Sequence, residues 1–179
     1  MAVQSRRATE DDLRATPKDG QRYELVDGEI HATPGGVRHS RVCVRLVVAL
    51  ETFASEHALG QVLGFGTGLR FPGGNVRSPD LTFTAAARLG ATLLSDDFAE
   101  VIPDLAVEVL ARGESALYVL ESVVEYLEAG VRLVWVIDPA KSKALVYRSL
   151  GDVTEIGAYG ELDGGTVLPG FRCRLADVL

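Results

Sequence analysis

Two long segments of the chain carry apolar residues every three or four positions, which is the period of an amphipathic helix. The first segment covers residues 37–58, and Gly60 stands where this helix would end. The second covers residues 114–129 and is followed by Gly130. The side chains expected on the inner faces are Val42, Leu46, Leu50 and Phe53 in the first helix and Ala116, Leu120, Val123, Val124 and Leu127 in the second.

The other apolar runs are short and predict β-strands. RYELV and EIHAT flank Asp27-Gly28, a sequence that favours a tight turn between two hairpin strands. Residues 9–15 predict a short helix with Thr9 as its N-cap, and LADVL at the C-terminus predicts a helical turn. Further strands are expected at about 61–65, 68–71, 78–84, 104–110, 131–138, 143–149, 154–159 and 166–171, with 85–101 as a loop or short helix.

Strands interrupted by two long helices predict an α/β or α+β fold, with a sheet whose faces are covered by helices. A length of 179 residues suits one domain. We expect residues 1–20 to form an N-terminal helical extension and residues 21–179 to form the core. The longest apolar runs have only about five residues, whereas a membrane-spanning helix needs about 20, so no such helix and no secretory signal is predicted.

The charge balance limits the possible functions. The chain has 25 acidic and 18 basic residues and a formal charge of −7, which disfavours binding of nucleic acid by bulk electrostatics. The balance is compatible with carboxylates that hold a divalent cation. Only three of the basic residues are lysines, namely Lys18, Lys141 and Lys143.

The two cysteines, Cys43 and Cys173, lie in apolar segments. They are too few and too far apart in the sequence to predict a disulfide scaffold or a thiolate metal site. We interpret them as a buried, reduced pair in a cytoplasmic protein.

Glu108 is the first candidate for chemistry, because it interrupts the apolar strand at 104–110. A carboxylate in such a strand is costly to bury unless it is paired or bound to a cation. Strand alternation places Ala106, Glu108 and Leu110 on one face. The alternative is a strand near the edge of the sheet, from which the carboxylate would reach water.

Two further acids are candidate cation ligands. Asp80 follows Pro79 at the start of a strand, and Glu24 shares a strand face with Arg22 and Val26. Each alone has a plain structural alternative, since Asp often begins strands and Glu24 could be an exposed hairpin residue. Together with Glu108 they could hold Mg²⁺ or Mn²⁺, which prefer oxygen ligands.

The ordered motifs RYELVDGEI, His39-Ser40 at a helix start, SPDLTF, IPDLAVEVL, YLEAGVRLVWVIDP and VLPGF resemble the Uma-type restriction endonuclease family. This family belongs to the PD-(D/E)xK nuclease superfamily. The resemblance implies a restriction-endonuclease-like mixed sheet flanked by helices and metal-dependent hydrolysis of DNA phosphodiester bonds. It places Glu24, Asp80 and Glu108 on the acidic, metal-binding positions and His39 on the helix-start histidine.

The chain departs from the family pattern at the lysine. The superfamily position two residues after the acid is Leu110, and the position on the following helix used by this family is Ser122. The aspartate usual one turn earlier is replaced by Tyr118. Arg112 is the nearest basic candidate, and an arginine can stabilise phosphate charge although it is a poor proton acceptor.

Two hypotheses follow. The first is a Mg²⁺- or Mn²⁺-dependent endonuclease, impaired by the missing lysine, in which Glu24, Asp80 and Glu108 bind the cation and Arg112 or His39 assists. The second is a degenerate member that binds nucleic acid or protein without catalysis. In either case we expect a homodimer and no small-molecule cofactor.

Other polar residues have plainer interpretations. His39 could contact a phosphate or cap its helix, and His31 and His57 are expected on the surface. The basic stripe on the first long helix could follow a nucleic-acid backbone, although a solvated helix face is the commoner explanation; its members are Arg38, Arg41 and Arg45. Trp135 is expected in the core.

Overall fold

The computed structural model describes residues 6–33, 35–64, 66–89 and 97–179. Helices and strands occur largely where the apolar pattern predicts them. In chain order the elements are α1 (Glu10–Arg14), β1 (Arg22–Val26), β2 (Glu29–Thr33), α2 (Val37–Glu56), β3 (Gly60–Gly64), β4 (Leu69–Arg70), β5 (Val76–Arg77), β6 (Leu81–Ala85), the 3₁₀ turn η1 (Ala86–Arg88), β7 (Leu105–Val109), α3 (Ala116–Ala129), β8 (Leu133–Asp138), β9 (Lys143–Ser149), β10 (Asp152–Gly157), β11 (Glu161–Asp163), β12 (Arg172–Arg174) and α4 (Leu175–Val178).

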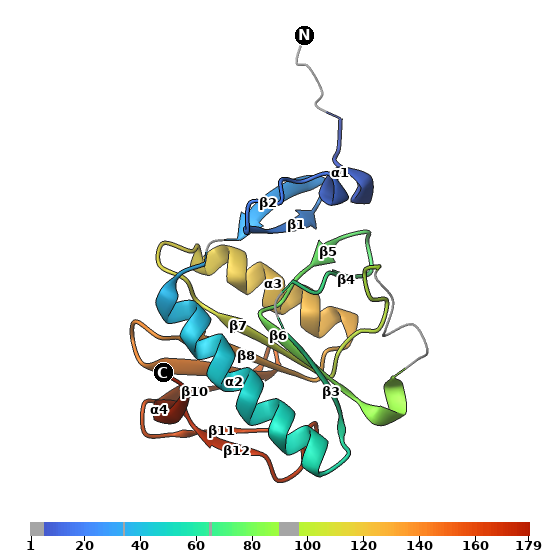
Figure 1. Cartoon of the computed structure of the whole chain (residues 1–179). Helices are drawn as coiled ribbons and strands as arrows, with labels where there is room; N and C mark the ends of the chain where they lie inside the picture. Colours follow the sequence, from blue (N-terminus) through green and yellow to red (C-terminus); the bar gives the residue numbers. More distant parts are fainter. Residues whose placement is uncertain (1–5, 34, 65, 90–96) are drawn as a thin grey trace.

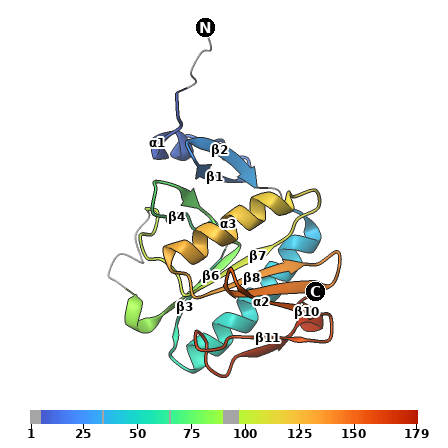
Figure 2. The same cartoon turned by 180° about the vertical axis from the view of Figure 1, so that it is seen from behind.

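A six-stranded mixed sheet lies between the two long helices (Figures 1 and 2). Its order is β10-β9-β8-β7-β6-β3, and β7 and β8 are parallel because α3 connects them. One face packs on α2, with Leu46 and Leu50 against Val107 and Trp135. The other face packs on α3. The predicted mixed sheet flanked by helices is confirmed, and Trp135 lies in the core as expected.

A second sheet covers one end of this sandwich. The β1–β2 hairpin turns at Asp27 and Gly28, which both have positive φ, and β1 also pairs with β5 in the order β2-β1-β5-β4. Helix α1 begins with the predicted Thr9 cap, which accepts the Asp12 backbone N–H while the Asp12 side chain accepts from Thr9. Arg70 of β4 forms an ion pair with Glu10 of α1, so that α1 is fixed to this second sheet.

Three details of the sequence prediction are wrong. The chain leaves α2 at Ala58, which has a φ of 51°, and Gly60 already belongs to β3, where a Cβ would lie 2.1 Å from the Thr84 carbonyl oxygen. Residues 166–171 form turns, and the strands that pair there are β11 and β12. Helix α3 buries Val119, Ser122, Val123 and Tyr126, whereas Leu120 is exposed. The apolar pattern missed this rotation of α3 because its buried face includes polar groups.

No helix among the described residues combines the length and the apolar character needed to cross a bilayer.

The packing of α2 on the sheet predicts a large cost for Leu46→Ala. Leu46 is fully buried in the core between α2 and the sheet, so the truncation leaves a cavity. We expect the free energy of unfolding in urea to fall by about 2–5 kcal/mol. Val48→Ala on the exposed side of the same helix is the control and should change it by less than about 0.5 kcal/mol. Equal losses in the two variants would contradict this packing.

Candidate active site

The sheet register brings two of the predicted acids together. Leu81 of β6 lies opposite Val107 of β7 in an antiparallel pair, and continuing this register by one residue places Asp80 opposite Glu108. Residues opposite each other in such a pair have Cβ atoms about 5 Å apart. Strand β7 also pairs with β8, so it is an interior strand. The alternative of a strand at the sheet edge is therefore wrong, although the Glu108 side chain is half-buried rather than fully buried.

The Asp80 carboxylate is buried and receives hydrogen bonds from three elements. Oδ1 accepts from Arg22 Nη1 of β1 at 2.6 Å. Oδ2 lies 3.0 Å from His39 Nε2 of α2 and accepts the Val109 backbone N–H of β7 at 2.8 Å. Burial would raise the pKa of Asp80, but the His39 hydrogen bond and the Arg22 charge outweigh it and hold the pKa below its usual value.

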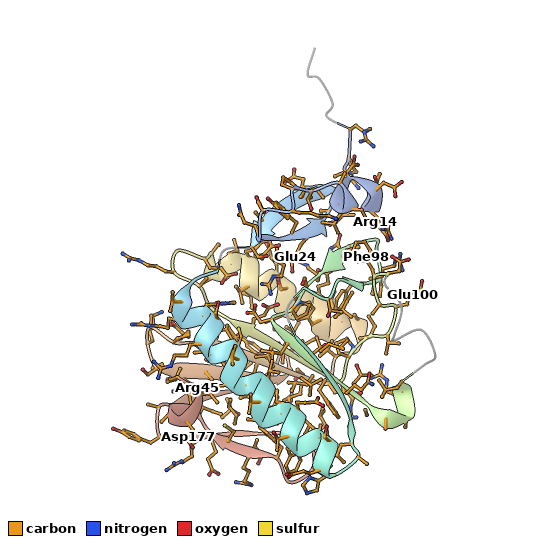
Figure 3. The ribbon with its side chains drawn as sticks, viewed as in Figure 1. Arg14, Glu24, Arg45, Phe98, Glu100 and Asp177 are labelled. Atoms are coloured by element: carbon orange, nitrogen blue, oxygen red, sulfur yellow. The ribbon has the colours of Figure 1, made fainter. Side chains whose placement is uncertain are left out.

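Glu24 is also buried, so the alternative of an exposed hairpin residue is wrong. It lies between the hairpin and α3 (Figure 3). Oε1 accepts the Ser78 backbone N–H at 2.7 Å, and Oε2 accepts the Tyr118 hydroxyl at 2.6 Å. Buried Arg77 lies 3.4 Å from Oε2 and forms a second ion pair, at 2.6 Å, with Glu125. Glu24 therefore has both a cation and two hydrogen-bond donors.

Glu108 has a different environment. Its Oε1 accepts the Tyr126 hydroxyl of α3 at 2.6 Å, and within the described ranges Glu108 forms no ion pair. Loss of hydration and the charges of Asp80 and Glu24 raise the pKa of Glu108 well above its usual value, against a smaller opposing effect of Arg22. Glu108 is thus the acid of the site whose charge is least compensated.

The face of α3 that lies against Glu24 and Glu108 carries no positively charged side chain. Tyr118, Ser122 and Tyr126 follow one another at four-residue intervals, so their side chains lie on the same side of the helix. The two tyrosine hydroxyls contact Glu24 and Glu108. Ser122 lies between them, is buried, and donates its hydroxyl to the Tyr118 carbonyl. Ser122, the position at which the family resemblance leads us to expect a lysine, therefore lies between the contacts of Glu24 and Glu108, but its side chain is short and neutral.

The remaining acceptor capacity of the carboxylates fits a hard cation. A carboxylate oxygen has two lone pairs. Among the described residues no donor reaches Glu108 Oε2, and Arg22 is the only side chain that donates to Asp80 Oδ1. A divalent cation bound by Glu108 and Asp80 would relieve the buried negative charge. Binding of one ion by Glu24, Asp80 and Glu108 together stays a prediction.

A different group of ligand atoms already converges. In the part of the chain that the structure describes, His39, Cys43 and Asp80 offer ligand atoms that all lie within 4.8 Å of one another. Both cysteines are free, Cys43 fully buried and Cys173 partly exposed, so they are not a buried pair. The spacing between the two cysteines could not predict the contacts of Cys43, because these come from His39 on the same helix and from Asp80 at the start of β6.

Arg112 is not brought into the acidic cluster. It is exposed and forms no hydrogen bond or ion pair within the described ranges, but it lines an open cavity of about 720 Å³ together with His39. In the basic stripe on α2, Arg38 and Arg41 are exposed, whereas Arg45 donates to the Leu179 carbonyl near α4.

His31 and His57 lie close to the protein surface. His31 is half-buried and its ring lies 5.4 Å from that of Tyr118, whereas His57 is exposed and stacks on Phe53 at 4.2 Å.

Four contacts of the acids were not predicted from the sequence, namely those of Arg22, Arg77, Tyr118 and Tyr126. Arg22 was detectable, because strand alternation places it beside Glu24. Arg77 had no such signal. The family resemblance drew attention to Tyr118, but not to its contact, because the contacts of Arg77 and the tyrosines join residues that are 18 to 94 positions apart.

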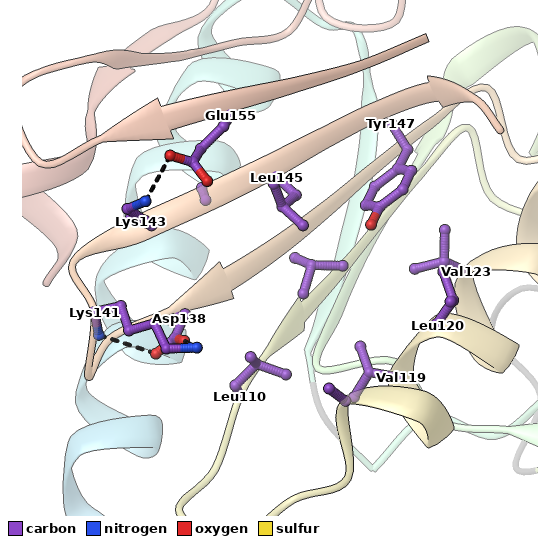
Figure 4. A pocket seen from close by; sticks show the side chains of 13 residues that line it. Leu110, Val119, Leu120, Val123, Asp138, Lys141, Lys143, Leu145, Tyr147 and Glu155 are labelled. Carbon is purple, nitrogen blue, oxygen red and sulfur yellow. Dashed lines mark hydrogen bonds and ion pairs between the residues drawn. The ribbon is translucent and has the colours of Figure 1, made fainter. Parts of the chain in front are cut away.

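An apolar groove lies apart from these acids (Figure 4). It has a volume of about 320 Å³ and lies between α3 and β9, lined by Leu120, Val123, Leu145 and Tyr147 among others. Lys143 pairs with Glu155 and Lys141 with Asp138 at its rim. The lysines of this region are thus engaged away from Glu108.

The raised pKa of Glu108 predicts that its charge destabilises the metal-free protein. A carboxyl group whose pKa is higher in the folded state contributes stability at acid pH that is lost as the pH rises through the folded value. Glu108→Gln keeps an acceptor for Tyr126 and removes the charge. In chelator at pH 8 we expect its free energy of unfolding to exceed the wild-type value by about 1–3 kcal/mol.

The pH dependence supplies the check. The gain from Glu108→Gln should shrink as the pH falls below 5, where the unfolded carboxyl also takes up its proton. Exposed Glu128→Gln on α3 is the matched control and should show no such pH-dependent gain. A gain that is constant with pH, or a destabilised Glu108→Gln protein at pH 8, would show that Glu108 is not a source of unrelieved charge.

Comparison with known proteins agrees with the fold. No curated protein matches the chain in sequence. A crystal structure from Anabaena variabilis, described as "a putative nuclease belonging to DUF820", superposes with a TM-score of 0.83 over 95% of this chain and 96% of that one, at 18% identity. The model of the Uma2 family, described as "Putative restriction endonuclease", matches residues 10–176. This match covers most of the chain and includes every acid of the site, and the protein therefore belongs to the Uma2 family.

Proposed function

We propose that the protein is a nuclease that depends on Mg²⁺ or Mn²⁺ and hydrolyses phosphodiester bonds of DNA. Asp80 and Glu108 are its principal cation ligands, and Glu24 is the third acid. One observation carries the proposal. Glu108 lies opposite Asp80 on an interior strand, with a raised pKa and without an ion-pair partner in the described chain. A bound divalent cation supplies the positive charge that this arrangement lacks.

The chemistry follows from the residues around the acids. A cation at Asp80 and Glu108 would polarise a phosphoryl oxygen and acidify an attacking water molecule. Arg22 holds Asp80 in position, and Glu24 fixes the Ser78 backbone two residues before Asp80. His39 is partly exposed and lines two open cavities, of about 840 and 720 Å³, while its Nε2 is bonded to Asp80, so its role is to orient this carboxylate beside the substrate. Arg112 at the rim of the second cavity would contact a backbone phosphate.

A second candidate is a binding module without catalysis. The observation in its favour is the Tyr118–Ser122–Tyr126 face of α3, which offers hydroxyl groups where the family pattern has a lysine. Such hydroxyls satisfy carboxylates without stabilising the charge that develops on a phosphate during hydrolysis. A homodimer and a cytoplasmic location stay predictions under either candidate.

Cleavage of plasmid DNA in Mn²⁺ tests the first candidate. Glu108→Gln should lower the rate at least about 100-fold, because it removes a ligand charge from the cation. Calorimetric titration of Mn²⁺ should show binding to wild type and to Glu128→Gln, and loss of binding in Glu108→Gln. Equal cleavage by wild type and Glu108→Gln would exclude catalysis at this site. Absence of Mn²⁺ binding to wild type at millimolar concentration would favour the binding module.

Restoring the lysine gives an independent prediction. Ser122 lies on α3 between the two tyrosines whose hydroxyls reach Glu24 and Glu108, so a lysine there would extend toward both carboxylates. Ser122→Lys should raise the cleavage rate by about tenfold or more, because one charge-stabilising group contributes on this scale. The control is Leu117→Lys, which adds the same single charge at an exposed position of the same helix. An equal effect of the two variants would contradict a specific role of position 122.

A further inference from the structure

The three side chains that converge beside the acidic cluster differ in chemistry from the carboxylates. His39 and Cys43 lie four residues apart on α2, so both project from the same side of the helix, and Asp80 approaches them from the start of β6. His39 Nε2 lies 3.0 Å from Asp80 Oδ2, and Cys43 Sγ lies 3.9 Å from the same nitrogen. The donors are thus one nitrogen, one sulfur and one oxygen atom.

These separations suit a single small ion. Zinc binds nitrogen and carboxylate oxygen at about 2.0–2.2 Å and thiolate sulfur at about 2.3 Å. Ligand atoms at tetrahedral angles around one ion are therefore about 3.3–3.7 Å apart. The observed 3.0 and 3.9 Å bracket this range, and all three ligand atoms lie within 4.8 Å of one another, so side-chain movements of about an ångström would complete the geometry.

The surroundings hold the three ligands in place. Arg22 occupies Asp80 Oδ1 and the Val109 N–H donates to Oδ2, so that Oδ2 stays directed at the His39 ring. Cys43 is fully buried beneath His39, whereas His39 lines two cavities that open to solvent. An ion can therefore arrive from the His39 side, and water from these cavities can supply a fourth ligand. Such outer contacts commonly orient the ligands of protein metal sites.

We propose that His39, Cys43 and Asp80 form a binding site for a thiophilic divalent cation such as Zn²⁺ or Co²⁺. Thiolate and imidazole ligands favour these ions over Mg²⁺, which prefers oxygen. Binding replaces the His39–Asp80 hydrogen bond, and Cys43 releases its thiol proton to the solvent. The site shares Asp80 with the oxygen site of Asp80 and Glu108, and His39 and Cys43 take the place of Glu108.

Asp80 belongs to both sites, which has a functional consequence. An ion held by Asp80 Oδ2, His39 and Cys43 repels a second divalent cation at Glu108, so Zn²⁺ should compete with Mn²⁺. This consequence rests on the proposed nuclease function, whereas the binding of Zn²⁺ or Co²⁺ does not.

Titration of the full chain with Co²⁺, in a reducing and oxygen-free buffer, tests the site. A Co²⁺–thiolate bond gives an absorption band in the near ultraviolet that a site made of oxygen ligands lacks. We expect the band to saturate at one Co²⁺ per chain and to disappear when Zn²⁺ is added. It should be lost in Cys43→Ser and retained in Cys173→Ser, the matched control at the other cysteine. A band absent from wild type, or lost in Cys173→Ser instead, would overturn the proposal.

Two further variants test whether loss of the cobalt band could come from misfolding or from the nuclease site. His39→Ala leaves the buried thiol in place and should lose the band and the rise in melting temperature caused by Zn²⁺. Glu108→Gln should retain the cobalt band whether or not it still binds Mn²⁺. A band retained in His39→Ala, or one that depends on Glu108, would contradict the proposed ligand set.

Discussion

The Asp80 carboxylate is the point at which the elements of the site are joined. It accepts hydrogen bonds from Arg22 of β1, His39 of α2 and the backbone of Val109 in β7. The hairpin sheet, the helix on one face and the central sheet are therefore fixed to one another through a single buried anion. A buried carboxylate is costly unless donors and cations surround it, and here they come from segments up to 58 residues away. The geometry of the site follows from this requirement.

Charge is distributed unevenly within that geometry. Arg22 pairs with Asp80 and Arg77 with Glu24, whereas Glu108 has only the Tyr126 hydroxyl as a described side-chain donor. A hydroxyl satisfies one oxygen of a carboxylate but does not neutralise its charge. Loss of hydration is the main reason why the pKa of Glu108 is raised, and the charge deficit explains why nothing reverses this effect as His39 and Arg22 do for Asp80. This deficit is also the feature on which the proposed cation-dependent reaction rests.

The sequence predicted the parts of this arrangement that depend on local patterns. The spacing of apolar residues predicted the helices and the two faces of the strand around Glu108. The Asp27-Gly28 pair predicted the hairpin turn. The three acids were singled out by the cost of burial and by the family resemblance. The pairing of Asp80 with Glu108 depends on strand register, and the burial of Ser122 depends on how α3 rotates against the sheet. Neither follows from the pattern of apolar residues, because polar groups form part of both contacts.

The ionisation of Glu108 reports most directly on the charge deficit of the site. Protein labelled with ¹³C at the glutamate carboxyl groups allows Glu108 to be followed by NMR, with its signal assigned by its loss in Glu108→Gln. Without divalent cations, we expect an apparent pKa for Glu108 well above that of an exposed glutamate. Addition of Mg²⁺ should lower it. A Glu108 signal that titrates like an exposed carboxyl group, and does not respond to Mg²⁺, would contradict both the charge deficit and the metal site.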